Sequence, residues 1–172
     1  MNNNKYIFFE VLLPLFFAGS IYLIFRPEDT VIFSIADLVG IRPIIDSIRN
    51  QIDVSEFPQW FVYSLPGGFW LLSFQNILTW ANKFKGKHLI KTVLAAYFMG
   101  IGLEVSQAVH ITDGRFDWMD VLLYSAATVL ALSNVWLVQK KWQIYSESKL
   151  SNKFIGGVFM LFTCIIYLAD II

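Results

Sequence analysis

The sequence predicts an all-α fold, a polytopic transmembrane bundle of about five spanning helices with a short extracytoplasmic amphipathic helix. Composition is the first reason: of the 172 residues, 56% are hydrophobic and only 15% are charged, whereas a soluble domain carries roughly 25% charged residues. The second reason is arrangement. The apolar residues lie in long blocks and the charged residues lie between them, which is typical of a protein solvated by lipid.

Five apolar blocks are long enough to cross a bilayer as helices. A span needs about 20 mostly apolar residues, because each residue rises ~1.5 Å against a ~30 Å core. Strands of a membrane barrel would be about half as long and would alternate in polarity. We therefore expect one integral membrane domain over residues 1–172, with spans at Tyr6–Phe25, Trp60–Trp80, Thr92–Val109, Met119–Val138 and Phe154–Ile172.

The first apolar block has a second interpretation, as a cleaved signal peptide. Lys5 gives it a positive start, and residues 18–20 are small enough for a cleavage site. Glu10 interrupts the apolar region, however, and apolar residues continue to Phe25, where a signal peptide would already have ended. These two features favour a retained span.

The basic residues predict the orientation. Nine of the 13 lie at Lys5 or in the loops 81–91 and 139–153, and the other four lie on the opposite side of the predicted membrane. Because cytoplasmic loops hold an excess of Lys and Arg, we expect a cytoplasmic N-terminus and an extracytoplasmic C-terminus. Attraction to anionic lipid is sufficient to explain lysines beside helix ends, so the sequence predicts no nucleic-acid partner.

The connection 26–59 is the longest between spans and has a pattern of its own. Pro43 suits the first position of a helix, and isoleucines then recur at helical spacing over residues 44–52, with charged and amide side chains between them. This predicts a short amphipathic helix that lies in the outer interface or caps the bundle.

The second predicted span contains Leu65-Pro66-Gly67-Gly68. Proline removes a backbone donor and glycine weakens a helix. One interpretation is a kink tolerated by neighbouring helices. The other is a broken helix whose freed backbone groups line a cavity.

Glu104 and Gln107 form a polar stripe within the third predicted span. Glu104 lies about 18 Å from the start of that span at ~1.5 Å per residue, and Gln107 follows one turn later on the same face, which Tyr97 and Gly100 share. A carboxylate at the centre of a spanning helix costs roughly 2.5–3.5 kcal/mol on insertion scales. The stripe is therefore expected to face protein or a water-filled cavity.

The following hairpin supplies complementary groups. Its turn is short, so the third and fourth spans are expected to be antiparallel neighbours, and this would bring Arg115, Asp117 and Asp120 near Glu104. Tyr124 continues the same face of the fourth span at helical spacing. A ligand site is one interpretation. The other is structural: an aspartate caps the helix while Arg115 neutralises Glu104.

Metal ligands are sparse in this sequence. Cys164 is the single cysteine, and the two histidines, His88 and His110, fall in different predicted loops. We therefore expect no metal site and no cofactor.

The arrangement Glu-x-x-Gln, a short turn with Arg, and Asp at the head of the next helix resembles the VanZ-like family. The specific match covers residues 100–131, where Tyr124 and Ala127 stand in place of the Asn and Gly usual in the family. The resemblance implies a bacterial inner-membrane protein of the cell envelope. It also implies a link to glycopeptide resistance, since the namesake is associated with low-level teicoplanin resistance. The residues that match the family motif are Glu104, Gln107, Arg115 and Asp120, with Asp117 in register with a further acidic position. Together with Tyr124, which shares a helix face with the two aspartates, they form the predicted ligand site.

Three classes of function follow. The first is a non-catalytic envelope protein that binds membrane lipid, a lipid-linked precursor or a glycopeptide-like ligand at this site. The second is a small enzyme acting on a lipid head group, with Glu104 as general acid and base; it lacks an evident nucleophile, because Ser106 faces away from Glu104 and Ser125 has no histidine in register. The third, a proton-coupled carrier with Glu104 as relay, is disfavoured by small size and the lack of an internal repeat.

Overall fold

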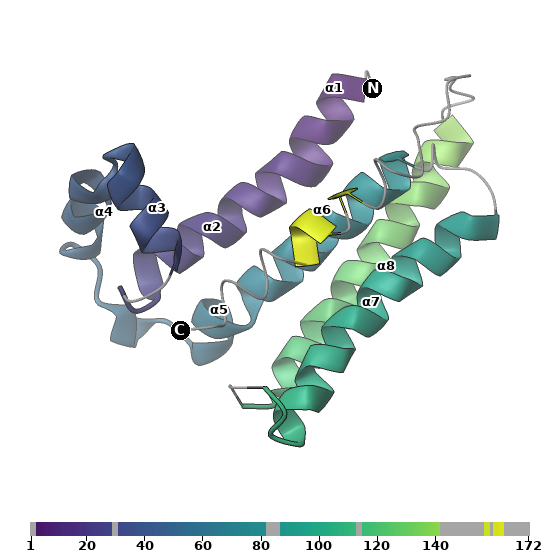
Figure 1. The fold of residues 1–172 in the computed structure, drawn as a ribbon. Helices are drawn as coiled ribbons and strands as arrows, with labels where there is room; N and C mark the ends of the chain where they lie inside the picture. The colour runs from purple at the N-terminus through teal and green to yellow at the C-terminus, as the bar shows by residue number, and fades with distance from the viewer. Residues whose placement is uncertain are drawn as a thin grey trace.

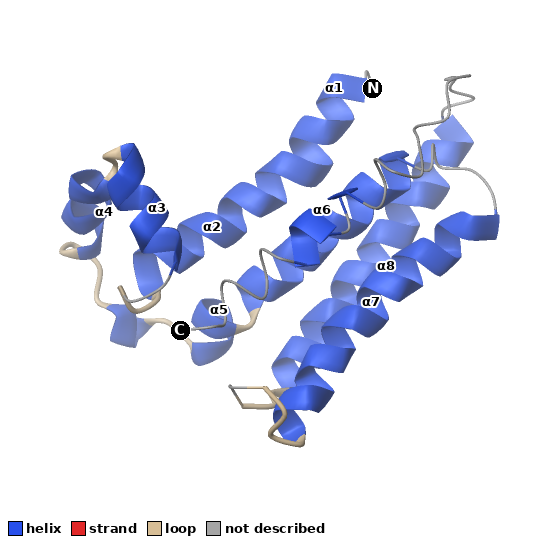
Figure 2. Ribbon diagram, in the orientation of Figure 1, coloured by secondary structure: helices blue, strands red, loops and turns tan. Residues whose placement is uncertain are grey.

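The computed structural model describes residues 3–28, 31–81, 87–112, 115–141, 157–158 and 160–163. Within these ranges all regular structure is helical (Figure 2), which confirms the all-α prediction. The elements in chain order are α1 (Asn3–Tyr6), the π-helical turn η1 (Ile7–Leu12), α2 (Leu13–Phe25), α3 (Val31–Val39), α4 (Arg42–Arg49), the 3-10 turn η2 (Val54–Glu56), α5 (Gln59–Tyr63), α6 (Leu65–Ala81), α7 (Lys87–Ala108) and α8 (Trp118–Lys141).

Three helical stretches of the described chain are long and apolar enough to cross a membrane: Ile7–Phe25, Leu89–Ala108 and Trp118–Leu137. They agree with three of the predicted spans, and they are compatible with a membrane protein. The predicted span Trp60–Trp80 is instead divided at Ser64 into α5 and α6. Most of Phe154–Ile172 lies outside the described residues, as do Cys164 and residues 142–153 of the second lysine-rich loop, so a count of five spans is not confirmed.

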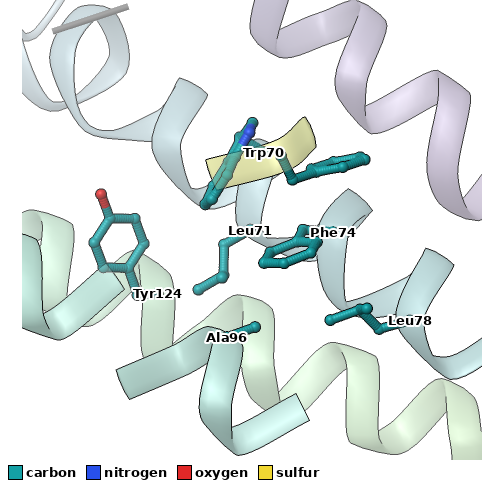
Figure 3. Packing of buried hydrophobic residues seen from close by; sticks show 7 residues of the cluster. Trp70, Leu71, Phe74, Leu78, Ala96 and Tyr124 are labelled. Carbon is teal, nitrogen blue, oxygen red and sulfur yellow. The ribbon is translucent and has the colours of Figure 1, made fainter. Parts of the chain in front are cut away.

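The central element is α6, which packs against α2, α7 and α8. Figure 1 shows these four helices side by side, with α6 antiparallel to α2 and α7. Because neighbours cover it on several sides, its apolar side chains Leu71, Phe74 and Leu78 are 0% exposed. Figure 3 shows them extending from α6 toward Ala96 and Tyr124, where they form the main core.

Leu65-Pro66-Gly67-Gly68 begins α6 and does not kink a longer span. Pro66 is the second residue of the helix, where the N–H that it lacks would have had no intrahelical acceptor. The Gly68 N–H already bonds to the Ser64 carbonyl at 3.2 Å. The preceding helix α5 ends at Tyr63, whose carbonyl accepts a hydrogen bond from Arg26 Nη2 at 3.1 Å.

The segment between α2 and α5 contains two short helices where the sequence predicted one. Gly40, with a φ of 77°, turns the chain between α3 and α4, a left-handed conformation that glycine adopts without steric cost. Figure 1 shows the pair beside the C-terminal end of α2 and away from α7 and α8. Each helix has one buried and one exposed side: Ala36 and Ile45 are buried, whereas Leu38 and Ile44 are exposed apolar residues.

Two arginines hold the α3–α4 pair in place: Arg49 attaches α4 to the end of α2, and Arg42 joins α4 to α3. Arg49 Nη1 donates to the carbonyls of Leu23, Ile24 and Arg26 at 2.9–3.1 Å, and a cation at this position also suits the negative end of the α2 dipole. Arg42 binds Asp46 at 2.9 Å within α4. The buried ring of Phe33 lies 4.6 Å from the Arg42 guanidinium and 5.1 Å from that of Arg49, within the range of cation–π attraction.

Pro14 sets the local form of the first long helix. An α-helix would pair the N–H of residue 14 with the Glu10 carbonyl, and proline has no N–H. The chain widens into η1 just before it, with the Leu13 N–H bonded to the Phe8 carbonyl. Asn76 Nδ2 of α6 then donates to the Glu10 carbonyl at 2.9 Å, so the missing donor is replaced from the neighbouring helix.

We expect Asn76→Leu to lower the free energy of unfolding by about 1 kcal/mol, because it leaves the Glu10 carbonyl without this donor in an apolar setting. The loss should shrink in a Pro14→Ala background, where residue 14 regains its N–H. Unfolding in mixed detergent micelles measures the free energy for the original protein, the two single variants and the double variant. Equal losses from Asn76→Leu in the two backgrounds would contradict the assignment.

Candidate functional site

The buried carboxylate of Glu104 lies where α7 meets the start of α8. Its side chain is 4% exposed, and its Oε2 accepts a hydrogen bond from the Asp117 backbone N–H at 3.3 Å. Since α7 and α8 pack against each other, the two polar rows expected from the sequence do face one another. Glu104 thereby fixes the position of the chain just before α8.

Asp117 caps α8. Its Oδ1 accepts a hydrogen bond from the Met119 N–H at 2.8 Å, which satisfies one of the N–H groups that a helix start leaves unpaired. Asp120, one turn further into the helix, is partly exposed. The helix-capping interpretation of Asp117 is therefore confirmed.

Tyr124 occupies a slot between two glycines of neighbouring helices. A Cβ at Gly67 of α6 would lie 3.1 Å from both Cε1 and the hydroxyl of Tyr124, and a Cβ at Gly100 of α7 would lie 3.3 Å from its Cδ2. The ring therefore fits only because both positions lack a side chain. Three helices meet at this residue, and α6 is brought to the same end of the bundle as Glu104.

The remaining two predicted site residues lie nearer the surface. Arg115 is exposed, and among the described residues it makes no ion pair with Glu104. Gln107 is half-buried on the last turns of α7, and its carbonyl accepts the His110 N–H at 3.1 Å. The structure thus buries Glu104 and Tyr124 between helices, places the exposed Asp117 beside Glu104 through its backbone N–H, and leaves Arg115 exposed.

His110 ends α7. It has a φ of 58°, and the Ile111 N–H that follows bonds to the Ser106 carbonyl at 2.8 Å. Together with the bond from the His110 N–H to the Gln107 carbonyl, this is the hydrogen-bond pattern of a Schellman helix stop. A structural reason thus accounts for His110, and the short turn to α8 follows from it.

Two buried polar atoms around the start of α6 have no hydrogen-bond partner within the described structure, Ser64 Oγ and Trp70 Nε1. Ser64 lies at the break just before α6, three residues before Gly67, and Trp70 lies within α6, three residues after Gly67. Buried polar groups are normally paired with protein, water or a ligand. These two atoms therefore add hydrogen-bonding capacity at this end of the bundle.

Sequence reasoning missed a second polar region, in the middle and far half of α6. Ser73, Gln75, Asn76 and Thr79 are all 0% exposed. Gln75 Nε2 donates to the Val93 carbonyl of α7 at 3.2 Å and to Thr128 Oγ1 of α8 at 2.8 Å. The signal was present in the sequence as several polar residues within an apolar block. No group of three or more His, Cys, Asp or Glu side chains is placed to hold a metal ion in the described part of the chain.

Comparisons of this chain with protein-family models, with curated proteins and with solved structures find no match.

We expect Gly67→Ala to lower the free energy of unfolding by about 1–3 kcal/mol, because the new methyl group would press on a ring that Gly100 confines from the other side. Detergent unfolding measures the loss, which should largely vanish in a Tyr124→Ala background. Gly102→Ala is the matched control: a Cβ there meets nothing within 4 Å, so stability should stay the same or rise by up to about 1 kcal/mol. Equal effects of the two alanines would contradict the slot.

Proposed function

We propose that this chain is a VanZ-like, multi-pass membrane protein of the bacterial cell envelope that binds an anionic, lipid-linked or glycopeptide-like ligand at the α7–α8 hairpin without catalysing a reaction. The proposal includes about five spans, with α6 and the segment Phe154–Ile172 as the two beyond the three long apolar helices. It also includes a cytoplasmic N-terminus, which would place the hairpin at the outer leaflet of the inner membrane.

The observation that best supports this proposal is the different environment of the two charged side chains, Glu104 and Arg115. Glu104 is buried and accepts a hydrogen bond from the Asp117 N–H. Arg115 is exposed and, among the described residues, is in no ion pair. The guanidinium is thus available to an anionic group, for which its planar fork offers paired donors. The other three arginines of the chain are engaged: Arg26 donates to the Tyr63 carbonyl, Arg42 binds Asp46, and Arg49 donates to carbonyls at the end of α2.

Each remaining group has a role in this proposal. Asp120 and Gln107 are partly exposed and would accept or donate hydrogen bonds to hydroxyl and amide groups of the ligand. The Tyr124 ring fills the space between Gly67 of α6 and Gly100 of α7. Glu104 and Asp117 would hold the frame that presents Arg115.

The contacts of the two serines do not favour the enzyme alternative. Ser106 Oγ donates to the Leu103 carbonyl at 2.7 Å and contacts Thr112 Oγ1 at 2.8 Å. Ser125 Oγ donates to the Val121 carbonyl and lies 3.1 Å from the Tyr97 hydroxyl. Both hydroxyls are engaged in these contacts, and among the described residues neither forms a hydrogen bond with a base that would activate a serine nucleophile.

We expect Arg115→Lys to lose most of the anionic lipid that copurifies with the protein while its melting temperature stays the same, because an ammonium keeps the charge and loses the paired donors. Native mass spectrometry and lipid extraction measure the bound lipid. Glu104→Gln should lower both bound lipid and stability, since it weakens the acceptor for the Asp117 N–H.

The control is Arg49→Lys, at an arginine whose three carbonyl contacts are structural. It should lower the melting temperature and leave the lipid-to-protein ratio unchanged. The proposal fails if Arg115→Lys retains its lipid, or if it destabilises the fold as much as Glu104→Gln while lipid follows only the amount of folded protein.

A further inference from the structure

A second carboxylate at membrane depth, Glu10, lies at the opposite end of the bundle from the hairpin. It is the fourth residue of the apolar stretch Ile7–Phe25 and is half-buried. Figure 1 shows that the start of this helix lies at the same end as the C-terminal ends of α6 and α8. The α7–α8 hairpin does not use Glu10, and the site proposed above does not account for it.

The hydrogen bonds around Glu10 come from three helices. Its Oε2 accepts from Asn134 Nδ2 of α8 at 2.7 Å. Its backbone carbonyl accepts from Asn76 of α6, and the Tyr6 hydroxyl donates to Asn76 Oδ1 at 3.3 Å. Ser73 Oγ of α6 donates to the Val11 carbonyl at 2.8 Å. The carboxyl group is thus bound by Asn134, and it lies beside a hydrogen-bonded polar cluster of Tyr6, Ser73 and Asn76.

The described side chains that hydrogen-bond to Glu10 or to its immediate neighbours are neutral. On its own helix Tyr6 and the exposed Lys5 are titratable, α6 contributes an amide and a hydroxyl, and α8 contributes the amide of Asn134. None of the described side chains forms an ion pair with Glu10. An ionised carboxylate without a cation is unfavourable at membrane depth, and the neutral acid avoids that cost.

We propose that Glu10 is a proton-binding site, in which Oε1 carries the proton while Oε2 accepts the Asn134 hydrogen bond. The proton exchanges with the aqueous phase at the N-terminal end of the helix. Release of the proton leaves a negative charge between α2, α6 and α8, and the Asn134 hydrogen bond then strengthens because its acceptor is charged. Proton occupancy at Glu10 is thereby linked to the contact between the first long helix and α8.

The test uses dicyclohexylcarbodiimide, an apolar reagent that reacts with protonated carboxylic acids in membranes. The carboxyl proton moves to one carbodiimide nitrogen, the carboxylate oxygen adds to the central carbon, and acyl migration to nitrogen leaves a stable N-acylurea. Purified full-length protein in lipid nanodiscs is treated across a range of pH, and peptide mass spectrometry locates the adduct.

The expected adduct is on Glu10, with labelling that falls as pH rises. Glu28 and Glu56, which lie outside the apolar stretches, are the matched control carboxylates and should remain unlabelled. Glu10→Gln should remove the adduct. Glu104→Gln should leave it in place, because this inference does not rest on the hairpin site.

Asn134→Ala separates a proton site from a purely structural carboxylate. Removing a donor that favours the ionised form should shift the labelling profile toward higher pH. The proposal is overturned if Glu10 in the folded protein is labelled no more than Glu28 and Glu56 at any pH. It is also overturned if Asn134→Ala, still folded by its detergent melting curve, has the same labelling profile as the unaltered protein.

Discussion

The polar side chains of α6 are the contact on which the rest of the bundle depends. Ser73, Gln75, Asn76 and Thr79 have no exposed surface, and in an apolar bundle each must find a partner within the protein. Three of them reach across to other helices, where they bind the carbonyls of Glu10, Val11 and Val93 and the hydroxyl of Thr128. Hydrogen bonds between facing helices add to apolar packing a requirement for particular partners, because each donor must meet its acceptor.

These contacts also explain why the chain tolerates irregular backbone. Pro14 interrupts the hydrogen bonding of the first long helix, and the wider turn η1 sits beside Asn76 and Ser73, which donate to two of its carbonyls. At the other end, the Ser64 break between α5 and α6 is supported by Arg26, which donates to the Tyr63 carbonyl. In both places a donor from a distant part of the chain binds a carbonyl at the irregular backbone.

The two ends of α6 lead to different chemistry. At its start, Gly67 makes room for Tyr124, close to the turn held by Glu104. Toward its end, Asn76 lies beside Glu10, which Asn134 also binds. Rotation of α6 about its axis would disturb both, so a single register of this helix positions the proposed ligand site and the proposed proton site together.

Long apolar blocks made the helical class and three of the spans predictable, because length and hydropathy need no knowledge of partners. The short turn likewise predicted that Glu104 would lie near Asp117, and helix-start chemistry predicted the cap. The role of Leu65–Gly68 could not be predicted from these four residues alone, because proline is compatible with either a kink or a helix start. The outcome depends on the break at Ser64 and on Arg26, which binds the Tyr63 carbonyl. Likewise, the hydrogen bonds of Asn76 and Asn134 depend on which helices become neighbours, which composition does not specify.

The double-mutant cycle of Gln75→Leu with Thr128→Val tests most directly whether α6 holds its neighbours by side-chain hydrogen bonds. Gln75 links α7 and α8 through bonds of 3.2 and 2.8 Å. We expect Gln75→Leu to cost about 1 kcal/mol of unfolding free energy in mixed micelles, with a measurable coupling to Thr128→Val. A Gln75→Leu protein as stable as the original, with strictly additive effects in the double variant, would show that packing alone holds the bundle.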